Sequence, residues 1–426
     1  MAHPIFGVFG KLADGAVESV VIGSCLTKQV VNWLVNINRI RILGFTEQHY
    51  PGTFEQLDGG DKRVLRAFLD PESLSNTYSL LVGAGSLNTA SEYRISSADL
   101  VHLLHDTMGT EATFDNSFVE RKEGPDAFPH ERWFFINGIA TSRELARRGA
   151  RRLQDMFGRS FTLIHNPTQG LTNDLLESAM QKFTNVNTEP VARAFVEIAK
   201  ALLDAETRKV VVVAHSQGTI ITGDVLDLLY LSIDQRFFDR SNMNDEDLAE
   251  FLTVSSGTVK SGELRQLSAE LREAGLEVLK KLELYMFANA ASRMCYADPE
   301  QRFPHIESYA NEHDIVTRLG SLARDDFHKE DLIRIDGSLF TCARSGHLLN
   351  AHYLPDFERN RYELLLGHDG RCIGSSVHDR VRGNPGPKHR LHRTGPETPR
   401  LREYLNGAEP NAASPNARPQ EPRYAD

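Results

Sequence analysis

The sequence is poor in cysteine and contains no long apolar run. Its 426 residues include four cysteines, and no two of them have the spacing of metal ligands: Cys25, Cys295, Cys342 and Cys372. Such scattered cysteines exclude a disulfide framework of the kind that small secreted domains use. No apolar stretch reaches the roughly 18 residues of a membrane span, and the amino-terminal residues lack the pattern of a signal peptide. We therefore expect a reducing, cytoplasmic compartment.

Basic residues are also in short supply. Lys and Arg total 48 against 58 Asp and Glu, which gives a formal net charge of −10. This balance argues against a nucleic-acid partner, because binding to a phosphate backbone depends on a basic surface. Hydrophobic residues make up 40% of the chain and charged residues 25%, which is typical of a globular protein.

Composition divides the chain into three regions. Residues 1–127 mix strand and helix signals without a chemical motif, so we interpret them as an accessory α+β region that either stands apart or contributes early strands to the main sheet. We expect residues 128–367 to form the folded core, and the pattern of residues 231–282 within it predicts a helical insertion. That insertion either caps a pocket or packs on the sheet as an ordinary surface helix. Residues 368–426 are rich in Pro and Arg, keep no apolar period and predict a disordered tail.

The core pattern predicts an α/β fold with a doubly wound, mostly parallel sheet. Strand and helix signals alternate over residues 133–230, which implies parallel βαβ units. Further strands are predicted at Leu284–Ala288 and at His305. Asp336-Gly337, between two short apolar runs, is typical of a β-hairpin.

The most informative stretch is the predicted strand that begins at Val210, together with the turn that follows it. Val210–Val213 are four consecutive valines, and they predict a strand that is buried on both faces. After Gly218 the apolar residues recur at helical spacing. The turn between them is Ala214-His215-Ser216-Gln217-Gly218. A strand that turns this sharply into a helix needs small residues at Ala214 and Gly218, and it exposes the Ser216 hydroxyl at the carboxyl end of the sheet.

This stretch resembles the nucleophile elbow of the α/β-hydrolase superfamily, with Ala214 where the usual pattern has Gly. The resemblance covers roughly residues 130–355. It implies the α/β-hydrolase fold, with Ser216 as a nucleophile that is followed along the chain first by an acid and then by a histidine.

The implied acid and base lie far downstream of the elbow. Asp314 follows a predicted strand in the context Asn-x-x-Asp-x-Val, and it is the implied acid, with Glu312 as the alternative. His347 comes just after the last predicted strand, and it is the implied general base, with His352 as the alternative. Because both histidines lie within a short stretch of chain, only geometry separates them.

The resemblance also implies an oxyanion hole formed by the backbone N–H groups of Gln217 and Ile139. Four residues near the elbow, at strand carboxyl ends, are expected to line the substrate site: Gly138, His215, Asn166 and Thr168. Catalysis by these groups needs no metal and no organic cofactor.

The function that follows from the resemblance is a serine hydrolase of the lipase and esterase type, active in lipid metabolism. It would cleave a carboxylic ester, of a small molecule or a lipid, through an acyl-enzyme on Ser216. Two alternatives stay open: an acyltransferase or thioesterase with the same triad, and a catalytically silent binding protein with the hydrolase fold. The basic part of the tail permits a weak contact with an anionic membrane surface. The sequence does not determine the oligomeric state.

Overall fold

The computed structural model describes the following residues: 118–121, 127–138, 141, 143–166, 189–234, 259–296, 304–312, 314–318, 320–323, 333–344, 347–366, 392–393 and 399–410. The predictions on Ile139, on Thr168 and on nearly all of residues 1–127 lie outside these ranges. Among the described helices, none has the length and apolar character needed to cross a membrane.

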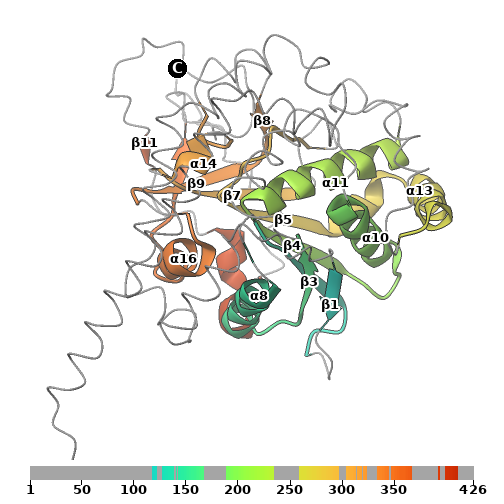
Figure 1. Ribbon diagram of the computed structural model, residues 1–426, viewed down its shortest axis with the longest axis horizontal. Helices are drawn as coiled ribbons and strands as arrows, with labels where there is room; N and C mark the ends of the chain where they lie inside the picture. The colour runs from blue at the N-terminus through green and yellow to red at the C-terminus, as the bar shows by residue number, and fades with distance from the viewer. Residues whose placement is uncertain are drawn as a thin grey trace, which may run out of the picture.

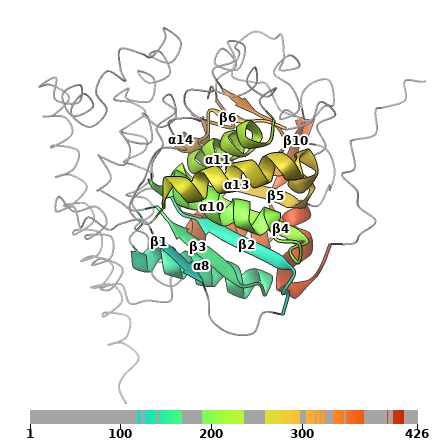
Figure 2. The same ribbon diagram turned by 90° about the vertical axis from the view of Figure 1, so that its right-hand side faces the viewer.

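The described strands form a nine-stranded, mostly parallel sheet in the order β1-β3-β2-β4-β5-β7-β9-β10-β11 (Figures 1 and 2). The strands are β1 (Phe118–Arg121), β2 (Glu131–Ile136), β3 (Phe161–His165), β4 (Lys209–His215), β5 (Leu282–Phe287), β7 (His305–Asn311), β9 (Ser338–Cys342), β10 (Glu363–Leu366) and β11 (His392–Arg393). The six strands from β3 to β9 run parallel, so that their carboxyl ends share one edge. Strands β1, β10 and β11 pair antiparallel.

The valine strand β4 lies in the middle of the sheet, as its composition predicts. Val210 and Val212 face one side, and Val211 and Val213 face the other; all four are fully buried. A strand can bury consecutive apolar side chains only where helices cover both faces of the sheet.

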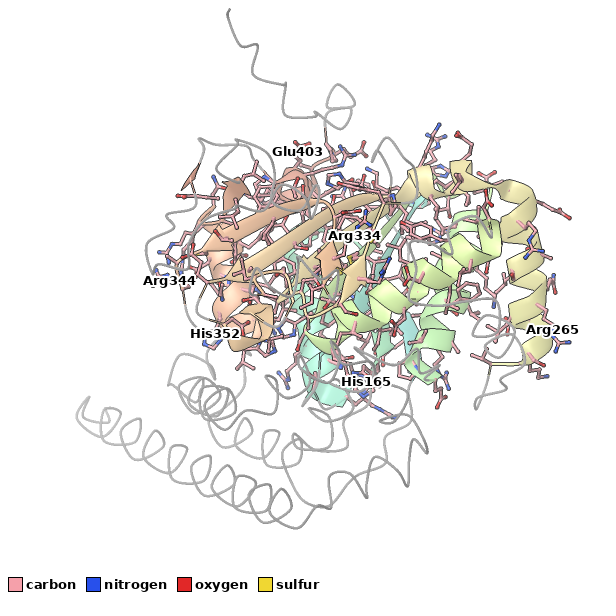
Figure 3. The ribbon with its side chains drawn as sticks, turned by 90° about the horizontal axis from the view of Figure 1, so that it is seen from above. His165, Arg265, Arg334, Arg344, His352 and Glu403 are labelled. Atoms are coloured by element: carbon pink, nitrogen blue, oxygen red, sulfur yellow. The ribbon has the colours of Figure 1, made fainter. Side chains whose placement is uncertain are left out.

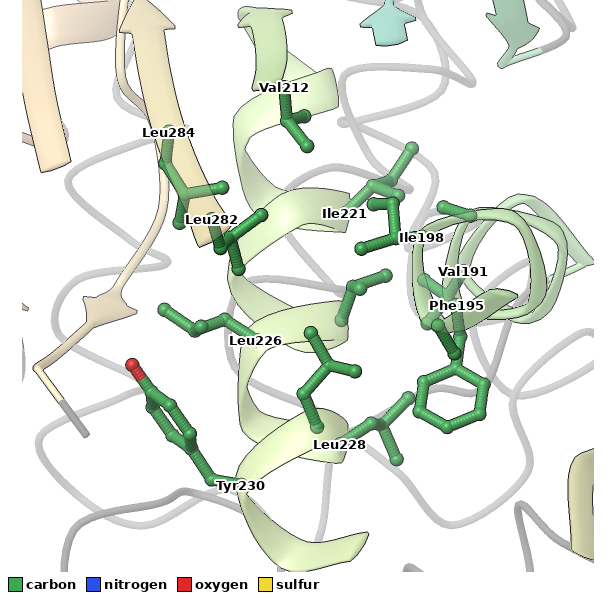
Figure 4. Close-up of a cluster of buried hydrophobic side chains, with 14 of the residues drawn as sticks. Val191, Phe195, Ile198, Val212, Ile221, Leu226, Leu228, Tyr230, Leu282 and Leu284 are labelled. Atoms are coloured by element: carbon green, nitrogen blue, oxygen red, sulfur yellow. The ribbon is translucent and has the colours of Figure 1, made fainter. Parts of the chain in front are cut away.

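Helices do cover both faces, which confirms the α/β class. On one side lie α10 (Glu189–Leu203), α11 (Gln217–Ile233) and α13 (Ser261–Ala274), and on the other α8 (Arg143–Phe157), η3 (Leu349–Tyr353), α16 (Leu354–Glu358) and η5 (Arg400–Gly407). Figure 4 shows buried side chains of α10, α11, β4 and β5 on the first side, among them Ile198, Ile221 and Leu284. The short elements are η2 (Leu276–Lys281), α14 (Ile315–Arg318), β6 (Arg293–Met294) and β8 (Arg334–Ile335).

The predicted helical insertion is, where described, a crossover of the fold. Helix α11 continues to Ile233, and α13 packs along α10 and α11 and leads through η2 into β5. Leu264, Leu267 and Leu271 on α13 are buried in that contact. Residues 261–281 therefore pack against the helices that cover this face of the sheet.

The predicted disordered tail contains an ordered segment, so that prediction is wrong for residues 399–410. Leu401 and Tyr404 of η5 are fully buried against the sheet face that α8 also covers. The segment escaped prediction because it is a short 3-10 stretch without helical period, and its order comes from contacts with residues far away in the sequence.

Strand β1 lies within residues 1–127 and pairs with β3 in the main sheet, in line with the alternative that this region contributes early strands. The expected hairpin at Asp336-Gly337 is wrong: β8 pairs with β6, whereas β9 pairs with β7. The turn therefore carries the chain from the small sheet of β6 and β8 to the main sheet. It requires glycine, because Gly337 has a φ of +95° and a Cβ there would lie 2.4 Å from the Ile306 carbonyl oxygen.

Candidate active site

Ser216 occupies a strained turn between β4 and α11. Its φ is 56° and its ψ is −124°, a conformation that costs a non-glycine residue about 1–3 kcal/mol. The Ser216 N–H donates to the Phe287 carbonyl of β5 at 3.0 Å, and the Ser216 carbonyl accepts the Thr219 N–H at 2.8 Å. Main-chain bonds to strand and helix thus hold the turn, and the side chain is left at the carboxyl edge of the sheet.

Small residues let the end of β2 pack directly on this turn. A Cβ on Gly218 would lie 2.4 Å from the Ile136 carbonyl oxygen, and a Cβ on Gly138 would lie 2.7 Å from the Ser216 Cβ. Ala214 is fully buried at the position where the hydrolase elbow usually has Gly. The methyl group is therefore accommodated within the core.

The structure brings the three predicted triad residues together from separate strand ends. His347 Nε2 lies 2.8 Å from Ser216 Oγ, and His347 Nδ1 lies 2.8 Å from Asp314 Oδ2. The Asp314 side chain is 0% exposed and that of His347 is 11% exposed. The acid is sealed inside the protein while the imidazole reaches the surface beside the serine.

Asp314 is held as an ionised acceptor. The Val316 N–H donates to its Oδ1 at 2.9 Å, and the Tyr353 hydroxyl donates to its Oδ2 at 2.6 Å. Burial acts to raise the pKa of Asp314, but the facing His347 and the hydrogen bonds from His347, Tyr353 and Val316 lower it below its usual range. A carboxylate that stays charged can keep the His347 Nδ1–H pointing toward itself.

His215, next to the serine, supports the main chain of the candidate base. Its Nε2 lies 2.7 Å from the His347 carbonyl oxygen. Burial and the neighbouring His347 lower the pKa of His215 to about 3, so that the ring is neutral at pH 7. Because a carbonyl oxygen only accepts, the single proton of this ring lies on Nε2 and donates to His347.

The alternative acid and base make other contacts. Glu312 accepts a hydrogen bond from the Thr341 hydroxyl at 3.2 Å, and His352 Nδ1 accepts the Leu348 N–H at 3.0 Å. Figure 3 shows His352 and His165 on the same side of the molecule, opposite Glu403 of η5. His352 therefore lies near the carboxyl edge of the sheet, but the contact with Ser216 is made by His347.

Three side chains link the ends of β2, β3 and α11 beside the serine. Asn137 Nδ2 donates to the Asn166 carbonyl at 2.9 Å, and Asn137 Oδ1 accepts the Asn166 N–H at 2.9 Å. Asn166 Nδ2 in turn donates to Gln217 Oε1 at 2.6 Å. Gln217 is the first residue of α11, so its backbone N–H lies in the first turn of the helix. These amide contacts hold the side chain of Gln217, the residue that follows the serine.

The residues predicted to line the substrate site are placed close to the serine, and their described contacts are with the protein itself. Gly138 packs on the Ser216 Cβ, His215 supports His347, and Asn166 is 3% exposed behind Gln217. Thr168 and the oxyanion candidate Ile139 lie outside the described residues.

Sequence reasoning missed two residues of this site. No role is predicted for Asn137, although an Asn directly after a buried strand is a candidate for cross-linking loops. No role is predicted for Tyr353 either. Its contact with Asp314 joins residues 39 positions apart, and no local pattern predicts it.

Comparisons with known proteins add no family assignment. No protein-family model matches the chain, and none of the curated proteins matches it. In the described part of the chain, no group of three or more His, Cys, Asp or Glu side chains is arranged to hold a metal ion.

Proposed function

We propose that this chain is a serine hydrolase of the α/β-hydrolase fold that cleaves a carboxylic ester through an acyl-enzyme on Ser216. The observation that carries the proposal is the continuous relay from Ser216 Oγ to His347 Nε2 and from His347 Nδ1 to Asp314 Oδ2, each step 2.8 Å long. A serine hydroxyl is a weak nucleophile at neutral pH and needs a base within this distance.

The fold and the chain order give further support. Ser216 follows a central parallel strand, Asp314 follows β7 and His347 follows β9. The order of serine, acid and histidine along the chain is that of the α/β-hydrolases and differs from those of the chymotrypsin and subtilisin folds. The positive φ of Ser216 is the backbone conformation that a nucleophile elbow requires.

In the first half of the reaction, Ser216 Oγ attacks the ester carbonyl carbon while His347 Nε2 takes the hydroxyl proton. The carbonyl π electrons move onto oxygen and form a tetrahedral intermediate. Its collapse breaks the bond to the alcohol oxygen, which leaves with the proton from His347. Ser216 then carries the acyl group, and Asp314 stabilises the transient imidazolium.

Water completes the second half. His347 Nε2 removes a proton from a water molecule, whose oxygen attacks the acyl carbon. The second tetrahedral intermediate expels Ser216 Oγ, which takes back the proton from His347. The products are a carboxylic acid and an alcohol, and the enzyme returns to its starting state.

The oxyanion of each intermediate needs N–H donors at the helix start. We assign this role to the backbone N–H of Gln217, whose side-chain Oε1 accepts a hydrogen bond from Asn166 Nδ2. The N–H of Ile139, in the loop after β2, is the second candidate. Loss of one such donor typically costs ~10²–10³ in rate.

A fluorophosphonate probe tests the proposal, because it labels only a serine that a base has activated. We expect labelling of the wild type and of Ser232→Ala, a matched change of another buried serine, and none of Ser216→Ala. With p-nitrophenyl acyl esters, Ser216→Ala should lose ~10⁶ of kcat. Labelling of the Ser216→Ala variant, or failure to label the wild type, would reject the mechanism.

Product analysis separates hydrolysis from acyl transfer and thioester cleavage. The elbow sequence His215-Ser216-Gln217-Gly218 resembles those of lipases and esterases, which favours an oxygen ester. With an ester and an added alcohol, a hydrolase releases the free acid, whereas an acyltransferase forms a second ester. An acyl thioester that is cleaved faster than the matched oxygen ester would support a thioesterase instead.

A further inference from the structure

The phenol of Tyr353 and the imidazole of His347 share one oxygen of the candidate catalytic acid. Asp314 Oδ2 lies 2.6 Å from the Tyr353 hydroxyl and 2.8 Å from His347 Nδ1. The other oxygen, Oδ1, accepts the Val316 N–H at 2.9 Å. The hydrogen bond to Oδ1 therefore orients the carboxylate, and Oδ2 accepts hydrogen bonds from two donors at once.

We propose that Tyr353 is a positioning residue that weakens the hold of Asp314 on His347 and thereby sets the pH at which His347 becomes a competent base. This inference rests on the proposed function, since it assigns His347 as the general base. It concerns how the site is tuned, and it adds a residue that does not touch the substrate.

The hydrogen-bond geometry makes Tyr353 a donor to Asp314. Its hydroxyl oxygen accepts the Asn311 N–H at 3.3 Å, which leaves the phenolic proton for Asp314 Oδ2. Tyr353 is fully buried. Burial and the charge of Asp314 raise the pKa of Tyr353 well above its usual range, so the phenol keeps its proton throughout the working pH range.

The chain around Tyr353 holds the phenol in place. Tyr353 ends η3, a single π-helical turn in which its N–H bonds to the Leu348 carbonyl at 3.4 Å. Such turns are rare and occur often at functional sites. The ring of Tyr362 stacks on that of Tyr353, with centroids 6.3 Å apart and planes 13° apart. The element that begins just after the base thus also carries the group that modulates its acid.

The direction of the effect follows from the shared oxygen. A second donor on Oδ2 lowers the charge that faces Nδ1, so that the protonated imidazole of His347 is stabilised less. Removal of the phenolic hydroxyl should therefore strengthen the interaction of Asp314 with the protonated imidazole and move the acid limb of the labelling rate to higher pH. Among the described residues, the other titratable groups that face His347 are His215 from β4 and His352 from η3. His215 is neutral at these pH values and adds no charge of its own.

The test measures the second-order rate of fluorophosphonate labelling of Ser216 from pH 5 to 9 in the full chain. In Tyr353→Phe we expect the midpoint of the acid limb to move up by roughly half to one pH unit. Tyr362→Phe is the matched control, because its hydroxyl donates to Asn311 Oδ1 at 2.8 Å and not to Asp314. Its midpoint should equal that of the wild type.

A second variant keeps the inference testable if Tyr353→Phe folds poorly. Incorporation of 3-fluorotyrosine at position 353 keeps the hydroxyl and makes it a stronger donor, so the midpoint should move down. Equal midpoints in wild type, Tyr353→Phe and the fluorinated protein would overturn the inference, as would an equal shift in Tyr362→Phe. A wild type that is not labelled at all would instead refute the proposed function, and with it the assigned base.

Discussion

Replacement of Tyr404 by alanine tests whether the C-terminal segment is part of the folded core. Its ring is fully buried and meets Trp133 edge to face, with centroids 5.0 Å apart and planes 85° apart. Its hydroxyl donates to Glu283 Oε2 at 2.7 Å. Loss of a buried aromatic ring typically costs ~3–5 kcal/mol. The charged hydrogen bond accounts for ~1.5–3 kcal/mol within that range.

A shortened chain should show a larger effect. Arg400 donates to Glu283 Oε1 through Nε at 3.1 Å and Nη2 at 2.9 Å, and removal of residues 399–426 would deprive that buried carboxylate of this cation. Breaking a buried ion pair from one side costs ~3–5 kcal/mol. Together with the loss of Tyr404, this approaches the 5–15 kcal/mol of free energy that stabilises a typical domain.

Denaturant unfolding, followed by fluorescence, provides the assay. The free energy of unfolding should fall by ~4 kcal/mol in Tyr404→Ala and by ~2 kcal/mol in Tyr404→Phe. Removal of residues 411–426 alone is the control that separates the effect of residues 399–410 from that of the rest of the removed chain. If Tyr404→Ala and removal of residues 399–426 both unfold at the wild-type midpoint, the segment does not dock and our reasoning is refuted.

The stability difference between the wild type and the chain without residues 399–426 should depend on pH in one direction. Burial raises the pKa of Glu283, but the charge of Arg400 outweighs it and holds the folded-state pKa below its usual range. A carboxyl whose pKa is lowered by folding stabilises the protein above its unfolded pKa, and that stabilisation is lost as the pH falls through the folded pKa. The difference in free energy of unfolding between the wild type and the chain without residues 399–426 should therefore become smaller at acidic pH.

Three further results are expected. Asp314→Asn should lower kcat for ester hydrolysis by ~10⁴, because the imidazole loses its charged partner, whereas Glu312→Gln should stay near the wild-type value; equal losses in both would contradict the assignment of the acid. Gly218→Ala should cost ~1–3 kcal/mol in denaturant unfolding, since its Cβ would lie 2.4 Å from a backbone oxygen of β2. The pKa of His165 and that of His215 are both lowered to about 3 by folding. Because the unfolded chain takes up protons first, the free energy of unfolding should fall by up to ~2.7 kcal/mol per pH unit below about pH 6. Equal stability at pH 7 and pH 5 would contradict that.

Local sequence patterns were enough to locate the elbow and the strand ends around it. Val210–Val213 could only be a strand buried on both faces, and Gly218 and Ser216 then had to form a sharp turn at its carboxyl end. The strand and the turn depend on the burial and backbone geometry of neighbouring residues, which periodicity reflects directly. Asp314 and His347, in contrast, were expected near Ser216 because of the resemblance to the α/β-hydrolase superfamily, with Glu312 and His352 as alternatives.

The tertiary structure decided what depends on residues far apart in the chain. The assignments of His347 over His352 and of Asp314 over Glu312 as the contacting pair came from distances. The docking of Tyr404 on Trp133 could not be predicted, because a short segment without helical period owes its order to distant partners. The turn at Gly337 is the opposite case: its sequence is typical of a hairpin, but the neighbouring β7 and β6 offer the flanking strands better partners than each other. Local patterns determine which backbone conformations are favourable, whereas pairing and docking depend on the free energy of contacts that form only when the whole chain has folded.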